Sequence, residues 1–132
     1  MRKAMLKSNL VIIPTIPSQY DVPVLENMLE IYDESRPVNE KLLAFVLVNR
    51  ASPNPFLFKE LENLREFISR IKAEKDLKNV VLLKSSLFER QAYRKAVVEG
   101  KSVSEFCDKN DKALQDFENF YKELLKSVEE RL

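Results

Sequence analysis

The sequence LLAFVLV, residues 42–48, is an uninterrupted run of seven apolar residues. Such a run is typical of a strand buried on both faces, and strands of that kind belong to parallel sheets covered by helices. Two shorter runs have the same character: LVII at residues 10–13, which Pro14 closes, and VVLL at residues 80–83. We therefore expect three buried parallel strands.

The segments between these runs have helical periodicity. Apolar residues recur every three or four positions from about residue 22 to 32, with Asp21 as the expected N-cap and Arg36-Pro37 as the end. A second amphipathic stripe precedes the last strand, at Leu57, Leu61, Leu64, Ile68 and Ile71. Strands that alternate with helices predict right-handed crossovers, with the helices on the faces of the sheet.

The chain beyond residue 83 is expected to be helical. Gly100 should end one helix as a left-handed C-cap, and Asp108 or Asp111 should cap a long final helix. The apolar positions of that final helix are Leu114, Phe117, Tyr121, Leu124 and Val128. The prediction is a single α/β domain, residues 1–132, with a partial parallel sheet of about three strands, covering helices and a long C-terminal helix.

Composition excludes several kinds of chemistry. The 132 residues include one glycine and no histidine. A glycine-rich phosphate loop therefore cannot be built from this chain, and neither can a His-based zinc site or triad. Cys107 is the only cysteine and has no histidine to activate it. We predict no disulfide, no catalytic residue and no metal site in this chain.

Charge and hydropathy indicate a cytoplasmic protein. The 22 Lys and Arg residues against 21 Asp and Glu residues give a formal net charge of +1, which supplies no overall field for nucleic acid or anionic lipid. No run approaches the roughly 20 apolar residues of a membrane span. The basic start of the chain is followed by no cleavage pattern, and a single cysteine suits a reducing compartment. We expect no membrane contact.

Three parallel strands form a small sheet with exposed edges. Parallel sheets are usually larger and fully covered. An uncovered apolar edge attracts further strands. We therefore expect the chain to form a homo-oligomer, or to be a fragment of a larger fold.

Four segments in succession resemble the C-terminal portion of ParA/MinD-type partition ATPases, and most closely the small plasmid and chromosome partition ParA proteins. They are NLVIIPTIPSQYD at 9–21, FVLVNR at 45–50, ERQAYRKA at 89–96 and EGKSVSE at 99–105. The resemblance extends over essentially the whole chain, in order and with similar spacing. It implies the C-terminal half of a P-loop NTPase fold.

The resemblance also implies a function for the intact protein. It would be a deviant Walker ATPase that dimerises around ATP and Mg²⁺, binds DNA nonspecifically and is stimulated by a centromere-binding partner. The family's P-loop, signature lysine and magnesium-binding aspartates belong to an upstream half that this chain lacks. We therefore expect this chain alone to bind no cofactor and to hydrolyse no ATP. The alternative is a stand-alone, non-catalytic interaction module derived from such an ATPase.

A nucleotide-binding set is predicted on the adenine side. Asn49 matches the position where the family places Asn or Thr near the base, and Pro14 belongs to a loop that resembles the one beside the nucleotide. Lys84 and Ser85 follow the third predicted strand, at the edge where open α/β sheets bind ligands. The alternatives are structural: Asn49 as a turn residue, Pro14 as the end of a strand, and Lys84-Ser85 as a connection.

A DNA-binding set is predicted at Arg90, Arg94 and Lys101. These residues correspond to a region that helps relatives hold DNA, and phosphate contacts of this kind make binding salt-dependent. The alternative is a solvated helical face whose charge Glu89 and Glu99 neutralise.

Overall fold

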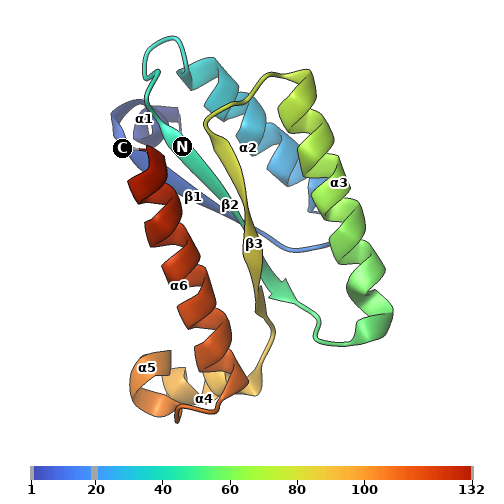
Figure 1. Ribbon diagram of the computed structural model, residues 1–132, viewed down its shortest axis with the longest axis vertical. Helices are drawn as coiled ribbons and strands as arrows, with labels where there is room; N and C mark the ends of the chain where they lie inside the picture. The colour runs from blue at the N-terminus through green and yellow to red at the C-terminus, as the bar shows by residue number, and fades with distance from the viewer. Residues whose placement is uncertain (1, 19–20, 132) are drawn as a thin grey trace.

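The computed structural model describes residues 2–18 and 21–131 as a three-stranded parallel sheet between helices (Figure 1). The strands are β1 (Leu10–Thr15), β2 (Leu43–Ala51) and β3 (Val80–Phe88). The helical elements are α1 (Arg2–Lys7), α2 (Val22–Ser35), the 3₁₀ turn η1 (Pro55–Leu57), α3 (Phe58–Glu74), α4 (Gln91–Val98), α5 (Val103–Phe106) and α6 (Lys112–Arg131).

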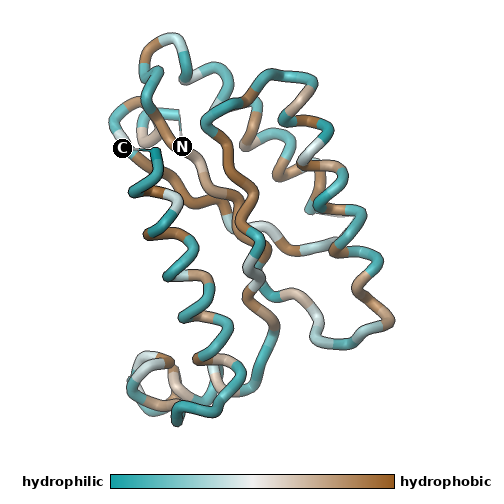
Figure 2. Tube along the Cα trace, viewed as in Figure 1, coloured by the Kyte–Doolittle hydropathy of each residue, from teal (hydrophilic) through white to brown (hydrophobic). Residues whose placement is uncertain are grey.

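Alternate residues of β2 divide the core into two layers. Ala44, Val46 and Val48 pack with α2 and α3 on one face of the sheet. Phe45 and Leu47 pack with α6 on the other face, against Phe120. Figure 1 shows α6 on the side opposite α2 and α3, and Figure 2 shows the strands as long apolar segments of the trace. The predicted α/β fold with a long C-terminal helix is confirmed.

Strand β1 differs from the prediction. The strand order is β1-β2-β3, so β1 is an edge strand. It continues through Pro14, which pairs with Leu47 and does not end the strand. A proline is tolerated there because an edge strand has one side that needs no N–H donor. The expectation that β1 is buried on both faces is wrong, since Ile12 is 39% exposed and Pro14 is also exposed.

Strands β2 and β3 run further than their apolar cores. Asn49 lies within β2 and does not begin a turn, and Lys84 and Ser85 lie within β3 and do not follow it. The polar residues remain in the ladder because pairing between the two strands resumes after irregular steps, at Val48–Ser86 and Ala51–Phe88. Apolar periodicity does not detect such polar extensions.

The ends of the helices test the capping predictions. Asp111 Oδ1 accepts from the Ala113 N–H at 2.9 Å, as expected for an N-cap. Gly100 has φ +66°, and the bonds Gly100 N–H to Val97 O and Lys101 N–H to Ala96 O form a Schellman cap. Asp21 occupies the N-cap position of α2, as predicted, but its side chain makes no capping hydrogen bond, so the expected capping interaction is absent.

Two short helices have no counterpart in the prediction. Helix α1 buries Met5, and the Asn39 side chain donates to the Met5 and Ser8 carbonyls at 2.9 and 2.8 Å. Helix α5 begins at a capping box in which Ser102 and Glu105 bond to each other's backbone N–H. The Ser-x-x-Glu spacing is a sequence signal for such a start. Within the described ranges, no helix has the length and hydropathy needed to cross a membrane.

Candidate functional site

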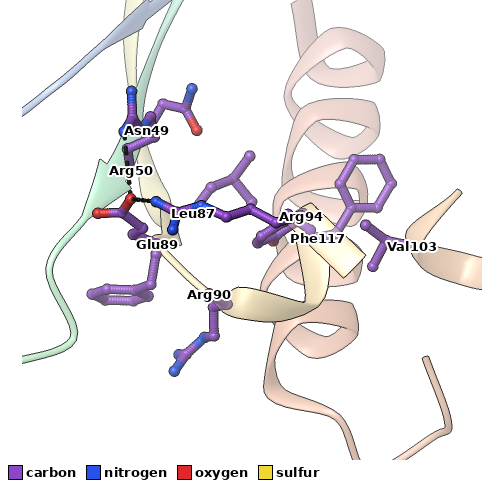
Figure 3. Close-up of a pocket in the computed structure, with 10 residues that line it drawn as sticks. Asn49, Arg50, Leu87, Glu89, Arg90, Arg94, Val103 and Phe117 are labelled. Carbon is purple, nitrogen blue, oxygen red and sulfur yellow. Dashed lines mark hydrogen bonds and ion pairs between the residues drawn. The ribbon is translucent and has the colours of Figure 1, made fainter. Parts of the chain in front are cut away.

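A pocket of about 400 Å³ opens at the carboxyl ends of β2 and β3, and we call it the carboxyl-edge pocket (Figure 3). Open α/β sheets bind their ligands at this edge. The lining residues are Asn49, Arg50, Leu87, Phe88, Glu89, Arg90, Tyr93, Arg94, Val103 and Phe117. They come from β2, β3, the β3–α4 connection, α4, α5 and α6, so the pocket exists only in the folded chain.

An irregular backbone at the end of β2 places Arg50 at the pocket. Arg50 has φ +55°, in the left-handed region that non-glycine residues rarely adopt. The ladder is irregular at the same place, because three steps of β2 from Val48 to Ala51 match two steps of β3. The extra residue is a β-bulge, which redirects side chains near the end of a strand.

The inner wall combines apolar side chains with one amide. Leu87, Val103 and Phe117 supply apolar surface (Figure 3). The half-buried Asn49 adds a carboxamide to this lining. A carboxamide offers both donors and an acceptor. The pocket can therefore hold a flat, mostly apolar group with a polar edge.

The rim of the pocket is charged. Glu89 accepts from Arg50 at 3.4 Å and from Arg94 at 2.7 Å, as the dashed lines in Figure 3 mark. The Arg94 side chain is 74% exposed, so it also remains open to solvent. Exposed ion pairs of this kind contribute at most about 1 kcal/mol each. An incoming anion can therefore compete with Glu89 for these two arginines.

Arg90 has a different environment from Arg94. Its Nε lies 2.9 Å from Asp116 Oδ2, and the two side chains are only 22% and 15% exposed. Its guanidinium also lies over the Phe88 ring, at 5.3 Å from the centroid. These contacts attach the start of α4 to β3 and α6.

Tyr93 adds a further link between α4 and α6. Its hydroxyl donates to the Ala113 carbonyl at 3.2 Å. Burial, and then the nearby Asp116 carboxylate, raise the pKa of the Tyr93 phenol. The hydroxyl is therefore a neutral donor at physiological pH.

The structure brings together part of each predicted set. Asn49, Arg90 and Arg94 line one pocket. Pro14 lies on the exposed face of β1, and Lys101 lies beyond α4, at 3.4 Å from Glu99. Neither lines the carboxyl-edge pocket.

Lys84 and Ser85 also lie outside the pocket lining. Their backbone N–H groups donate to the carboxylate of Glu123 in α6, at 2.7 and 2.8 Å. The sequence prediction missed seven lining residues: Arg50, Leu87, Phe88, Glu89, Tyr93, Val103 and Phe117. Arg50, Glu89 and Tyr93 each adjoin a predicted residue in the sequence, but the other four are apolar, and nothing in the sequence distinguishes them from core residues.

Titratable groups outside the pocket show no metal-binding arrangement. Across residues 2–18 and 21–131, no three His, Cys, Asp or Glu side chains are grouped so as to hold a metal ion. Desolvation, and then Asp111, raise the pKa of the Cys107 thiol. The thiol is therefore protonated at neutral pH and a poor nucleophile.

Comparison with known proteins gives one distant relative of interest. No protein-family model matches the chain. The chain is 25% identical over 123 residues to the maintenance of carboxysome distribution protein A of Halothiobacillus neapolitanus (strain ATCC 23641 / c2). The match includes 93% of this chain but 52% of that protein, so the chain spans about half the length of the curated relative it matches. This distant similarity supports a ParA-type relationship.

Proposed function

We propose that this chain is a portion of a ParA-type ATPase and that its carboxyl-edge pocket receives the adenine of the nucleotide. The observation that carries the proposal is the half-buried Asn49 carboxamide, which lines a pocket with apolar walls. Adenine fits this chemistry because it is flat and carries a donor beside an acceptor, which one carboxamide can pair with. Guanine presents two acceptors at the same edge and fits less well.

The phosphates and Mg²⁺ are assigned to residues outside this chain. Gly100 is the sole glycine and lies in a helix cap, so a phosphate loop has no source here. The ATPase activity proposed for the intact protein therefore needs an upstream half. The role we propose for the intact protein is the positioning of a large cellular cargo. The sequence resemblance favours plasmid or chromosome partitioning with a centromere-binding partner.

Nonspecific DNA binding is part of this proposal. Arg94 is the better candidate for a phosphate contact because its side chain is 74% exposed, whereas Arg90 is 22% exposed and paired with Asp116. Lys101, with a side chain 49% exposed, is the second candidate. Changing Arg94 and Lys101 to Ala should weaken the affinity of the intact protein for DNA uniformly across sequences at low salt, measured by fluorescence anisotropy.

The adenine assignment is tested by titrating the purified chain with adenosine and with guanosine while recording amide chemical shifts. With adenosine we expect saturable chemical-shift changes at Asn49 and at residues 87–90, and with guanosine smaller changes. In a separate titration with ADP, adding Mg²⁺ should not increase the affinity, because the phosphate and Mg²⁺ ligands are assigned outside this chain. Asn49→Ala should reduce adenosine affinity. Asn110→Ala, a matched change in the exposed loop before α6, should not. Equal affinity of both variants, or shifts elsewhere only, would contradict the assignment.

The uncovered side of β1 favours a second candidate, a stand-alone interaction module that self-associates. Ile12 is 39% exposed on an edge strand, and among the described elements none pairs with the outer side of β1. An edge of this kind accepts a strand from another chain. The oligomeric state of the purified chain tests this candidate.

A further inference from the structure

Strand β3 contains a two-residue insertion just before it reaches the carboxyl-edge pocket. Val46 pairs with Leu82, but Val48 pairs with Ser86, so two steps along β2 match four steps along β3. An even insertion preserves the alternation of faces. Leu87 accordingly packs in the same cluster as Leu83, on the α6 side. The insertion therefore determines which residues of β2 pair with the end of β3 that lines the pocket.

Glu123 holds the insertion from the α6 face. Its two carboxylate oxygens accept one backbone N–H each, from Lys84 at 2.7 Å and from Ser85 at 2.8 Å. Two adjacent strand N–H groups cannot both find partners in a regular ladder, because successive groups point to opposite sides of a strand. The carboxylate supplies both acceptors at one point.

Arg65 holds the same insertion from the α3 face. Its guanidinium donates to the Leu83 and Lys84 carbonyls at 3.1 and 2.9 Å and to the Ser86 hydroxyl at 2.9 Å. Burial lowers the pKa of Arg65, and the Glu123 carboxylate opposes that shift. Two opposite charges from different helices thus hold one distorted segment of β3 between them.

We infer that Glu123 and Arg65 are positioning residues for the carboxyl-edge pocket. Neither lines it. By holding the insertion, they fix the register in which Leu87 and Phe88 lie beside the end of β2. The inference rests on the proposed function only in naming adenine as the ligand, because the geometry of the pocket can be measured without any ligand.

Glu123→Gln is the test variant. The amide keeps the size of the carboxylate but turns one acceptor into a donor that faces a backbone N–H. Hydrogen bonds to charged groups contribute enough that exchange of the Lys84 and Ser85 amides should quicken by about tenfold or more. In the ligand-free protein, the amide shifts of residues 87–90 and Asn49 should also move. Adenosine affinity should fall in parallel.

Three comparisons separate positioning from general stability. Glu118→Gln changes an exposed glutamate of the same helix and should leave the pocket amides unmoved. Ile71→Val lowers the stability of the fold from within α3. When it is compared with Glu123→Gln under conditions that give both variants the same folded fraction, it should also leave the chemical shifts of the pocket amides unchanged. Arg65→Lys removes the planar guanidinium that holds the insertion from the opposite face, and it should change the chemical shifts of the same pocket amides. It replaces Glu123→Gln as the test variant if Glu123→Gln fails to fold.

The outcomes are distinguishable. If the amide chemical shifts change only at residues 83–86 in both Glu123→Gln and Arg65→Lys, and not at the pocket residues, the inference is overturned, whether or not adenosine binds. Absence of adenosine binding by the unaltered chain, together with moved pocket amides in the variants, would remove the adenine assignment and leave the positioning role supported.

Discussion

Gly100 has a backbone conformation that explains why a glycine is present there. Its φ is +66°, and a Cβ placed on it would meet nothing within 4 Å. The penalty for another residue is therefore conformational and not steric crowding by neighbours. Gly100→Ala should lower the free energy of unfolding by about 1 kcal/mol, measured by urea denaturation. Gly100→Asn should cost less, since Asn tolerates this region; equal losses would contradict the explanation.

Tyr32 makes stability depend on alkaline pH. The side chain is fully buried, and its hydroxyl donates to the Leu42 carbonyl at 2.9 Å. Burial raises the pKa of Tyr32 above its ordinary value of 10.0. Because the folded pKa exceeds the unfolded one, the contribution is fully present below about pH 10 and is lost as pH rises through the folded pKa.

Tyr32→Phe should therefore flatten the alkaline fall in unfolding free energy, while costing about 1 kcal/mol at neutral pH for the lost hydrogen bond. Urea denaturation between pH 7 and about 11 measures both effects. The raised pKa of Tyr93 should leave a residual slope in the variant. Tyr121→Phe, at an exposed position of α6, is the control and should change little.

At the scale of elements, helix α4 depends on one half-buried ion pair. Arg90 and Asp116 join its start to α6 with side chains 22% and 15% exposed, whereas Arg94 and Glu89 are 74% and 44% exposed. A double-mutant cycle with Arg90→Ala and Asp116→Ala should give a coupling energy of about 1–3 kcal/mol. The same cycle on Arg94 and Glu89 should give less than about 1 kcal/mol. Similar values would contradict the difference in burial.

The ends of the elements differ in how far local sequence determines them. The Gly100 and Asp111 caps form between residues close in sequence, and both could be predicted. Asp21 has the residue type of a cap, yet its side chain makes no capping bond. The polar ends of β2 and β3 pair because each strand has the other as a partner. A local pattern cannot predict them.

At the scale of the whole molecule, the open side of β1 predicts self-association. Ile12 lies beside Phe45 on a sheet face that α6 covers only in part. We expect the chain to form dimers or larger species at high micromolar concentration, measured by light scattering, because exposed apolar sheet edges recruit further strands. Ile12→Lys should shift the chain toward the monomer. Val38→Lys, an apolar residue 73% exposed in the α2–β2 connection, should not. A monomeric unaltered chain would contradict this expectation.

The candidate site shows the same division as the fold. Asn49, Arg90 and Arg94 could be named from the sequence, because their residue types and positions matched a known pattern. Their assembly with Phe117 and Val103 could not, since those side chains come from α6 and α5, which only packing brings to the end of the sheet. One member of the predicted nucleotide set, Asn49, and two of the predicted DNA set, Arg90 and Arg94, line the same pocket, whereas Pro14, Lys84, Ser85 and Lys101 lie outside its lining.

The sequence by itself determined the alternation of the three strands with α2, α3, α4 and α6, the parallel sheet and the two-faced burial of β2, because apolar periodicity is a property of neighbouring residues. Only the tertiary structure decided the insertion in β3, its attachment to Glu123 and Arg65, and the pairing of Arg90 with Asp116. These contacts join residues 18 or more positions apart. A charged residue in the sequence does not reveal its distant partner, and that partner decides whether the charge stays at the surface or holds a strand in place.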